Sequence, residues 1–237
     1  MSYFEGFVAA VPSANQDAYR EHARQALPFF KEFGATRMVE TWGDDVPRGK
    51  VNDFQGAVKA TDEETVVFSW IEYPDKATRD AANQKMMSDP RMQQMPEMPC
   101  DGKRMIFAGF EPIIEVGNGR GSYIDGYVLA VPQANREAYR RLASEVADLF
   151  LEYGALRVVE AWGDDVPEGK TTDYRRAVLL EDGEKVVFSW VEWPSKQVRD
   201  EGSARMMEDE RMKTPPSNMP FDGRRMIYGG FTSILDD

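Results

Sequence analysis

The stretch SYFEGFVAAVPSAN at residues 2–15 returns as SYIDGYVLAVPQAN at residues 122–135, and this repetition decides the fold. Further segments recur in the same order. GATRMVETWGDDVPRGK at residues 34–50 becomes GALRVVEAWGDDVPEGK at residues 154–170. A long period that occurs only twice indicates a domain duplication, because solenoids repeat a shorter unit many times.

The duplication divides the chain into two domains and a connection. Residues 1–115 and 122–237 each have the size of one compact domain. Between them, residues 116–121 are rich in glycine and lack hydrophobic periodicity, which is typical of a flexible linker. We therefore predict two domains of the same fold joined at residues 116–121.

The charge balance limits the classes of partner. The chain carries 29 Lys+Arg against 41 Asp+Glu, a net charge of -12. This excess repels a phosphate backbone and an anionic lipid surface, so we expect neither nucleic acid nor a membrane as partner. The single cysteine allows no disulfide within the chain, and the first residues lack the basic and apolar regions of a signal peptide. These features predict a cytoplasmic protein.

The pattern within each copy predicts a β-α-β-β-β-α-β order. Apolar runs bounded by Pro or Gly indicate strands, and apolar residues at helical spacing indicate helices. We expect Asn15 or Ser13 to cap the first helix, and Asp75 (Ser195 in the second copy) to cap the second helix. In the first copy the predicted strands are 3–11, 35–42, 54–60, 65–73 and 104–113, and the predicted helices are 15–33 and 75–89.

This order is that of a split βαβ unit with one extra strand, so the predicted fold class is α+β with ferredoxin-like domains. Such a sheet has both helices on one face, and its other apolar face needs a cover. The second copy supplies this cover within the same chain. We therefore predict a barrel-like pseudo-dimer in one monomer, with the two antiparallel sheets packed face to face and further self-association left open.

Four motifs carry a resemblance to a known family. They are the SY-x-[ED]-G start, the E-x-W-G-D-D-V-P loop, the VVFSW-[IV]-E-x-P strand and the MP-x-DG-[KR]-RMI strand, and each occurs in both copies. The chain thereby resembles the YbaA-like family of uncharacterised bacterial proteins, over nearly all of both copies. This resemblance implies the dimeric α/β barrel superfamily, here as a tandem duplication, and it implies no reaction.

Two strands of each copy place carboxylates beside tryptophans. Alternation puts Glu40 and Trp42 on one face of their strand, and Trp70 and Glu72 on one face of theirs. If the strands are neighbours, these side chains converge on a cleft. A carboxylate in such a partly buried cleft has a raised pKa and suits acid or base catalysis. The second copy repeats the set as Glu160, Trp162, Trp190 and Glu192.

A structural interpretation of the same residues is also open, and it is the one we favour. Tryptophans on a strand are ordinary core residues, and the glutamates can pair with Arg37 or Arg104. In that case the Trp/Glu sets contribute only to packing and ion pairing.

The W-G-D-D-V-P loop gives a second candidate for the lip of a pocket. Asp44 and Asp45, repeated as Asp164 and Asp165, stand between Trp-Gly and Val-Pro. Neighbouring residues on an extended chain point apart, which disfavours a shared metal ion, and Gly-Asp-Asp is also a common turn sequence. The loop is therefore either part of a ligand site or a structural turn.

The remaining reactive residues do not form a repeated site. His22 is Leu142 in the second copy, and Cys100 is Phe221. One histidine and one cysteine do not supply an ordinary zinc site, and we expect neither a metal nor a cofactor. The main functional prediction is a small organic molecule bound in the cleft between helices and sheet of each repeat, with cofactor-independent catalysis left open. The alternative is a non-catalytic binding or interaction module.

Overall fold

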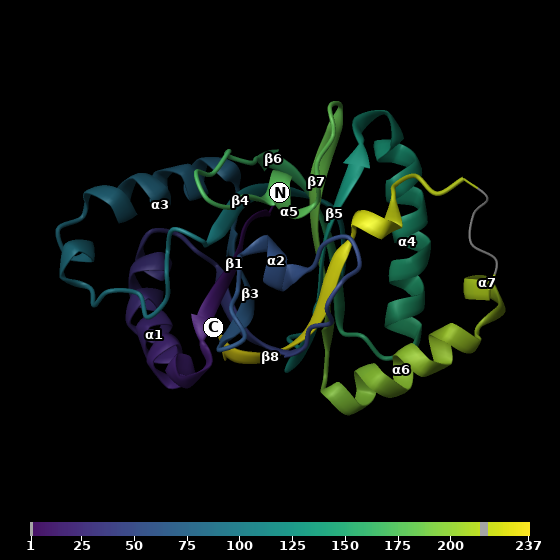
Figure 1. The fold of residues 1–237 in the computed structure, drawn as a ribbon, viewed down its shortest axis with the longest axis horizontal. Coiled ribbons are helices and arrows are strands. Elements are labelled where there is room, and N and C mark those ends of the chain that lie inside the picture. The colour runs from purple at the N-terminus through teal and green to yellow at the C-terminus, as the bar shows by residue number, and fades with distance from the viewer. Residues whose placement is uncertain (1, 214–217) are drawn as a thin grey trace.

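The computed structural model describes residues 2–213 and 218–237, and both repeats have the same order of elements. The first repeat alternates long strands and helices (Figure 1). Its elements are β1 (Tyr3–Pro12), η1 (Ser13–Asn15), α1 (Gln16–Glu32), β2 (Arg37–Asp45), α2 (Phe54–Ala57), β3 (Glu64–Tyr73), α3 (Lys76–Ser88), η2 (Met92–Gln94) and β4 (Ile106–Gly117).

The second repeat follows the first element by element, with α7 in the place of η2 and one additional short helix, η4. Its elements are β5 (Tyr123–Pro132), η3 (Gln133–Asn135), α4 (Arg136–Glu152), β6 (Arg157–Asp165), α5 (Tyr174–Ala177), β7 (Glu184–Trp193), α6 (Lys196–Glu208), α7 (Glu210–Lys213), η4 (Gly223–Arg225) and β8 (Ile227–Asp236).

All eight strands form one closed barrel in the order β1-β3-β2-β8-β5-β7-β6-β4. The predicted pair of ferredoxin-like domains with sheets packed face to face is therefore wrong. The strands of the two repeats instead pair edge to edge, β2 with β8 and β4 with β6. These edges carry unpaired backbone N–H and C=O groups, and antiparallel pairing between repeats satisfies them at both seams.

The shared core of the two repeats lies inside the barrel. Phe68 and Phe188 stack with their ring centroids 4.3 Å apart and their planes 2° apart. Trp70 and Trp190 lie beside them at 4.6 Å, and all four rings are fully buried. Because equivalent rings of the two repeats contact each other directly, the barrel has one hydrophobic interior rather than two separate cores.

The strand predicted at residues 54–60 is also wrong, since this segment forms the short helix α2. The Asp53 carboxylate accepts a hydrogen bond from the Gly56 N–H at 2.6 Å and caps the helix. Phe54 and Val58 then lie one turn apart and are both fully buried in the barrel core. An apolar run of this length is compatible with either a strand or a helix, and the cap provided by Asp53 favours the helix.

The longer helices cover the outer face of the barrel. Figure 1 shows α1 and α3 on the left of the strands and α4 and α6 on the right, with α2 and α5 near the middle. The predicted caps Asp75 and Ser195 are confirmed, because their side chains accept from the N–H groups of Thr78 and Val198. Both predicted caps of α1 are wrong, since the Asn15 side chain donates to the Pro99 carbonyl and the Ser13 hydroxyl shares a hydrogen bond with that of Thr65.

Candidate functional site

The structure divides the predicted Trp/Glu set between the two faces of the barrel wall. Val39 is the register partner of Trp70, and both residues belong to the barrel core. Glu40 therefore faces outward, where it accepts a hydrogen bond from Tyr19 of α1. Trp42 lies on this outer side as well, with its ring 6.4 Å from that of Tyr19. The side chains thus form an inner and an outer group instead of one converging cluster.

The inner group is a buried cluster of charges that joins the repeats. Arg37 donates to Glu192 at 2.7 and 2.9 Å and to Glu72 at 3.3 Å. Arg157 donates to Glu72 at 2.6 and 3.1 Å and to Glu192 at 3.2 Å. The indole N–H groups of Trp70 and Trp190 donate to these carboxylates too. Burial opposes the ionisation of Glu72, but Arg157 outweighs it and lowers the pKa of Glu72.

This cluster matches the structural interpretation of the two glutamates. Each guanidinium bridges a carboxylate of its own repeat and one of the other repeat, so the four charges hold the two halves in register. Arg104, the other partner considered, pairs with Glu64 at 2.6 Å instead. Because the charged groups of this cluster already pair with one another, they keep little hydrogen-bonding capacity for a ligand. We therefore assign the cluster a structural role.

The W-G-D-D-V-P segments also connect the two repeats, and their paired aspartates are the last residues of β2 and β6. The Asp44 carboxylate accepts from Tyr123 at 3.0 Å and pairs with Lys196 of the second repeat. The hydrogen bond from Lys196 lowers the pKa of Asp44. Asp45 lies 3.4 Å from Arg199.

The second segment repeats these contacts in the opposite direction. Asp164 accepts from Tyr3 at 3.0 Å and pairs with Lys76, and Asp165 accepts from Arg79 at 2.6 Å. These four carboxylates are thus placed at ion pairs between the repeats.

The outer group of the second repeat borders a pocket. This pocket has a volume of about 690 Å³ and lies between α4 and the outer face of β5, β6 and β7. Glu160 of β6 lines it and accepts a hydrogen bond from the Tyr139 hydroxyl of α4 at 2.6 Å. Trp162, two residues along β6, is buried beside Arg136, whose guanidinium carbon is 5.6 Å from the ring centroid.

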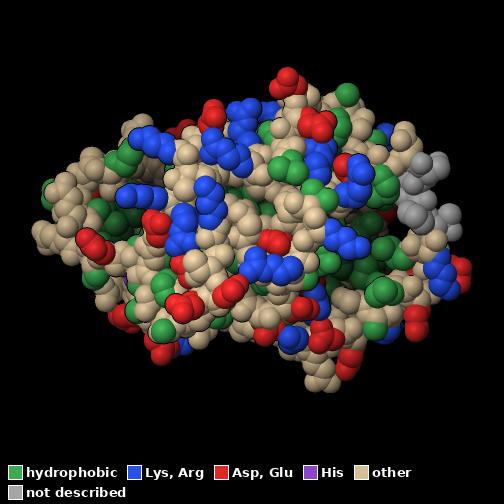
Figure 2. Space-filling view, in the orientation of Figure 1, with side chains coloured by type: hydrophobic (Ala, Val, Ile, Leu, Met, Phe, Trp, Pro, Cys, Tyr) green, Lys and Arg blue, Asp and Glu red, His purple; other side chains and the backbone are tan. Residues whose placement is uncertain are grey.

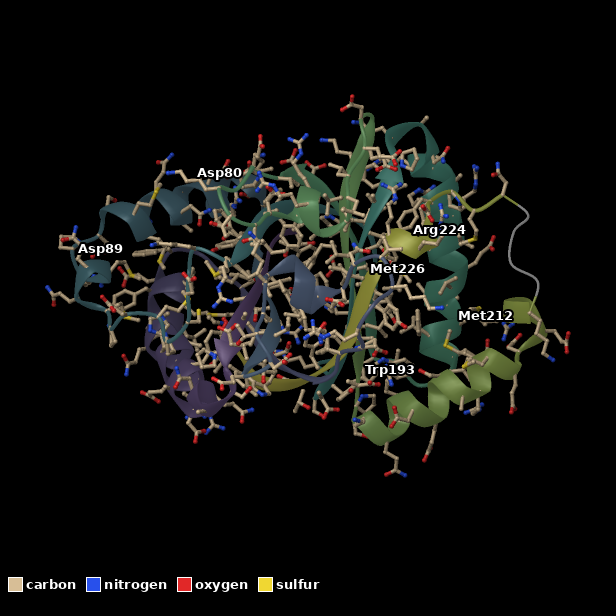
Figure 3. The ribbon with its side chains drawn as sticks, viewed as in Figure 1. Asp80, Asp89, Trp193, Met212, Arg224 and Met226 are labelled. Carbon is tan, nitrogen blue, oxygen red and sulfur yellow. The ribbon has the colours of Figure 1, made fainter. Side chains whose placement is uncertain are left out.

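The rest of the pocket wall is mainly apolar. Figure 2 shows hydrophobic side chains within a hollow on the right of the molecule, in the half that carries α4 and α6. Met212 reaches this region from α7 and Met226 from the segment before β8 (Figure 3). The other apolar lining residues are Leu129, Leu142, Ala143, Val146, Leu149, Phe150, Val191, Met219 and Phe221.

This apolar surrounding changes the acidity of Glu160. Burial raises the pKa of Glu160 from the usual 4.5 to about 7, although the hydroxyls of Tyr139 and Ser189 oppose the shift. Glu160 therefore exists in both protonation states near neutral pH. A carboxyl group with this property can accept or donate a proton at a bound molecule.

The first repeat holds the same polar groups in a different setting. Glu40 accepts hydrogen bonds from Tyr19 at 2.8 Å and from Ser69, and burial raises the pKa of Glu40. Where Leu142 and Phe221 line the pocket of the second repeat, the first repeat has His22 and Cys100. Burial raises the pKa of Cys100 to about 11, so this thiol is protonated at neutral pH.

Sequence reasoning found Glu160 but missed most of the residues around it. The sequence does contain one signal, since Tyr19 and Tyr139 occupy the same place on the first helix of each repeat. A buried tyrosine on an amphipathic helix needs a hydrogen-bond partner, and the outward-facing Glu of the adjacent strand is that partner.

Two kinds of feature are absent from residues 2–213 and 218–237. Within these ranges, no three or more His, Cys, Asp or Glu side chains are grouped so that they could hold a metal ion. None of the helices described there combines the length and the apolar character needed to cross a membrane.

Comparison with known proteins identifies the family. Residues 2–102 and 122–223 both match the model of the family described as "Protein of unknown function (DUF1428)". The chain belongs to this family. The "Uncharacterized protein YbaA" of Escherichia coli (strain K12) is 66% identical over 116 residues, which are 48% of this chain and 99% of that protein. The YbaA protein of Shigella flexneri matches to the same extent.

Solved structures with a similar fold have much lower sequence identity. A "putative monooxygenase" of Fusobacterium nucleatum subsp. nucleatum has a TM-score of 0.59 at 11% identity, covering 100% of this chain and 94% of that one. A "putative monooxygenase" of Lactobacillus acidophilus NCFM has a TM-score of 0.54 at 11% identity, covering 99% and 95%. An "anthrone oxidase-like protein" has a TM-score of 0.53 at 11% identity, covering 100% and 92%. These likenesses extend over almost the whole chain, and they show a shared fold.

Proposed function

We propose that the second repeat binds a small, ring-bearing organic molecule in the pocket beneath α4, where Glu160 exchanges a proton with it. The observation that carries this proposal is the carboxyl group of Glu160, largely buried and with a pKa of about 7, in the wall of a mainly apolar pocket of about 690 Å³. Ligand pockets of this size commonly combine apolar walls with a few polar groups that orient the ligand.

In this proposal each residue has a definite role. The Tyr139 hydroxyl donates to one oxygen of Glu160 and thereby fixes the carboxyl group in the pocket wall. Apolar side chains such as Leu142 and Phe150 exclude water from the ligand. In its ionised form Glu160 accepts a proton from a weakly acidic O–H or C–H group of the ligand, and the resulting acid can return that proton. This chemistry needs no group beyond the chain and the ligand.

The description of one protein of similar fold guides the choice of a test ligand. Because one similar fold is that of an anthrone oxidase-like protein, we choose anthrone as the first ligand. Its methylene group is flanked by two aromatic rings, and the anion left by loss of a proton is delocalised through them onto the carbonyl oxygen, which makes the C–H bonds weakly acidic. In heavy water, Glu160 removes a proton, its carboxyl group exchanges that proton with the solvent for a deuteron, and the deuteron is returned to the carbon, so this position exchanges without oxidation.

The experiment measures anthrone binding by calorimetry and exchange of its methylene protons by NMR, under nitrogen at pH 8. We expect the wild type to bind and to accelerate exchange, Glu160→Gln to bind without acceleration, and Leu142→Trp to lose binding. His22→Trp, at the equivalent place in the first repeat, is the control and keeps the binding of the second repeat.

Three results would overturn parts of this proposal. Absence of anthrone binding in the wild type refutes the ligand class. Binding without acceleration of exchange refutes the proton transfer by Glu160 and supports a non-catalytic binding module. Acceleration that persists in a folded Glu160→Gln protein removes Glu160 from the mechanism.

A further inference from the structure

A row of four side chains crosses the outer face of the second repeat beside the pocket. Glu160 of β6 is the register partner of Ser189 of β7, Ser189 is that of Tyr127 of β5, and Tyr127 is that of Tyr228 of β8. Side chains of directly opposed residues lie on the same face of a sheet. The row therefore leads from the carboxyl group across the pocket floor toward the surface, where Tyr228 is 50% exposed.

The first repeat has an equivalent row that differs at two positions. Ser69 donates to Glu40 and is the register partner of Phe7, which in turn opposes Phe107. The rings of Phe7 and Phe107 stack at 6.5 Å. Both phenylalanines are tyrosines in the second repeat, so the two rows differ by two hydroxyl groups while their carboxyl and serine groups are the same.

Of these two hydroxyl groups, that of Tyr127 belongs to the pocket. Tyr127 lines the pocket, whereas Tyr228 is the exposed end of the row. Among the described residues, the Tyr127 hydroxyl has no hydrogen-bond partner, whereas the Tyr139 hydroxyl donates to Glu160. Burial raises the pKa of Tyr127 well above its usual value of 10, so the hydroxyl remains a donor at any physiological pH.

Tyr127 is only partly buried, and its hydroxyl is free to donate a hydrogen bond to a ligand in the pocket. The backbones of Tyr127 and Glu160 are two strand spacings apart, about 10 Å. Their side chains thus contact separate parts of one ligand molecule.

We propose that Tyr127 is a positioning residue of the pocket in the second repeat. Its hydroxyl donates a hydrogen bond to a second oxygen of the ligand, remote from the group that faces Glu160. The pocket thereby selects planar molecules that carry two separated oxygen groups over molecules that carry one. This inference rests on the proposed function, since it concerns the same pocket.

The test compares 2-naphthol with 2,6-dihydroxynaphthalene, which share a ring system and differ by one hydroxyl group at the far end. Their dissociation constants are measured by calorimetry for the wild type and for Tyr127→Phe, which installs the residue of the first repeat. We expect the wild type to bind the diol about three- to tenfold more tightly, the range for one additional hydrogen bond. Tyr127→Phe should lose this preference and keep its affinity for 2-naphthol.

Two control variants separate the pocket from the rest of the row. Tyr228→Phe removes the exposed hydroxyl group, and Phe7→Tyr adds one to the first repeat. Neither should change the preference for the diol. If Tyr228→Phe lost the preference for the diol, the hydroxyl responsible would be the exposed one of Tyr228 and not that of Tyr127. This result would overturn the proposal.

The remaining outcomes distinguish this inference from the proposed function. Binding of 2-naphthol without preference for the diol, or equal weakening of both probes in Tyr127→Phe, refutes the role of Tyr127 and leaves the pocket as a ligand site. Failure of both probes to bind the wild type refutes the inference together with the proposed ligand class.

Discussion

Glu160 should make the stability of the protein depend on pH in a way that Glu160→Gln removes. Burial raises the pKa of Glu160 from 4.5 to about 7 in the folded state. This rise corresponds to about 3 kcal/mol, at about 1.36 kcal/mol for each pH unit between the folded and unfolded values. The stabilising contribution is fully present below pH 4.5, where the carboxyl group is protonated in both states, and is lost as the pH rises through 7.

The assay is urea unfolding followed by tryptophan fluorescence at several pH values between 4.5 and 8. Other carboxyl groups titrate in both proteins, so the informative quantity is the difference in unfolding free energy between Glu160→Gln and the wild type. As the pH rises from 4.5 to 8, the unfolding free energy of the variant should increase relative to that of the wild type by about 3 kcal/mol. The reason is that the amide never has to ionise in the apolar wall. Glu40→Gln should shift with the same sign, since burial also raises the pKa of Glu40.

The control is Glu145→Gln, which removes a carboxylate from an exposed position at the edge of the same pocket. Its effect should stay within about 0.5 kcal/mol at every pH. A difference curve for Glu160→Gln that is flat between pH 4.5 and 8 would refute the reasoning. It would mean that the carboxyl group is solvated in solution and has an ordinary pKa.

Two further predictions concern the contact between the repeats. Glu192→Gln removes the fully buried carboxylate that pairs with both Arg37 and Arg157, and should lower the unfolding free energy by about 3–5 kcal/mol in urea. Asp62→Asn, which removes an exposed partner of Arg48, should cost under about 1 kcal/mol, and similar losses in both variants would contradict the assigned burial. Cleavage at a protease site placed in residues 118–120 should leave the halves associated on gel filtration, because two seams of strand pairing and one core join them. Separation into single repeats at micromolar concentration would argue against this closed barrel.

The outer helices and most strands could be predicted from the sequence because their signals are local. The apolar spacing of α1 and the alternation along β3 reflect which side chains one element buries, whatever its neighbours are. The caps Asp75 and Ser195 depend only on the next three residues. The duplication itself is a property of the sequence alone, and so are the motifs that led to the family.

The closure of the barrel could not be obtained in the same way. Both a face-to-face packing of sheets and a closed barrel bury the same apolar positions, and they differ in the partners of the edge strands. The pairing of β2 with β8 joins residues nearly two hundred positions apart, such as Val39 and Asp236. No local pattern encodes that register, which is set by the backbone hydrogen bonds at the two seams and by the stacking of Phe68 on Phe188.

The candidate site shows the same division between local and tertiary information. Alternation along β2 determines that Glu40 and Val39 point to opposite faces, and alternation along β3 determines that Trp70 and Glu72 share one. Alternation does not determine which face of β2 lies on the same side of the sheet as a given face of β3. The register of Val39 with Trp70 decides this, and it sends Glu72 into the arginine cluster and Glu40 to the helices. The acidity of Glu160 was likewise decided only when α4 covered it with apolar side chains, because a pKa depends on the surroundings that folding creates.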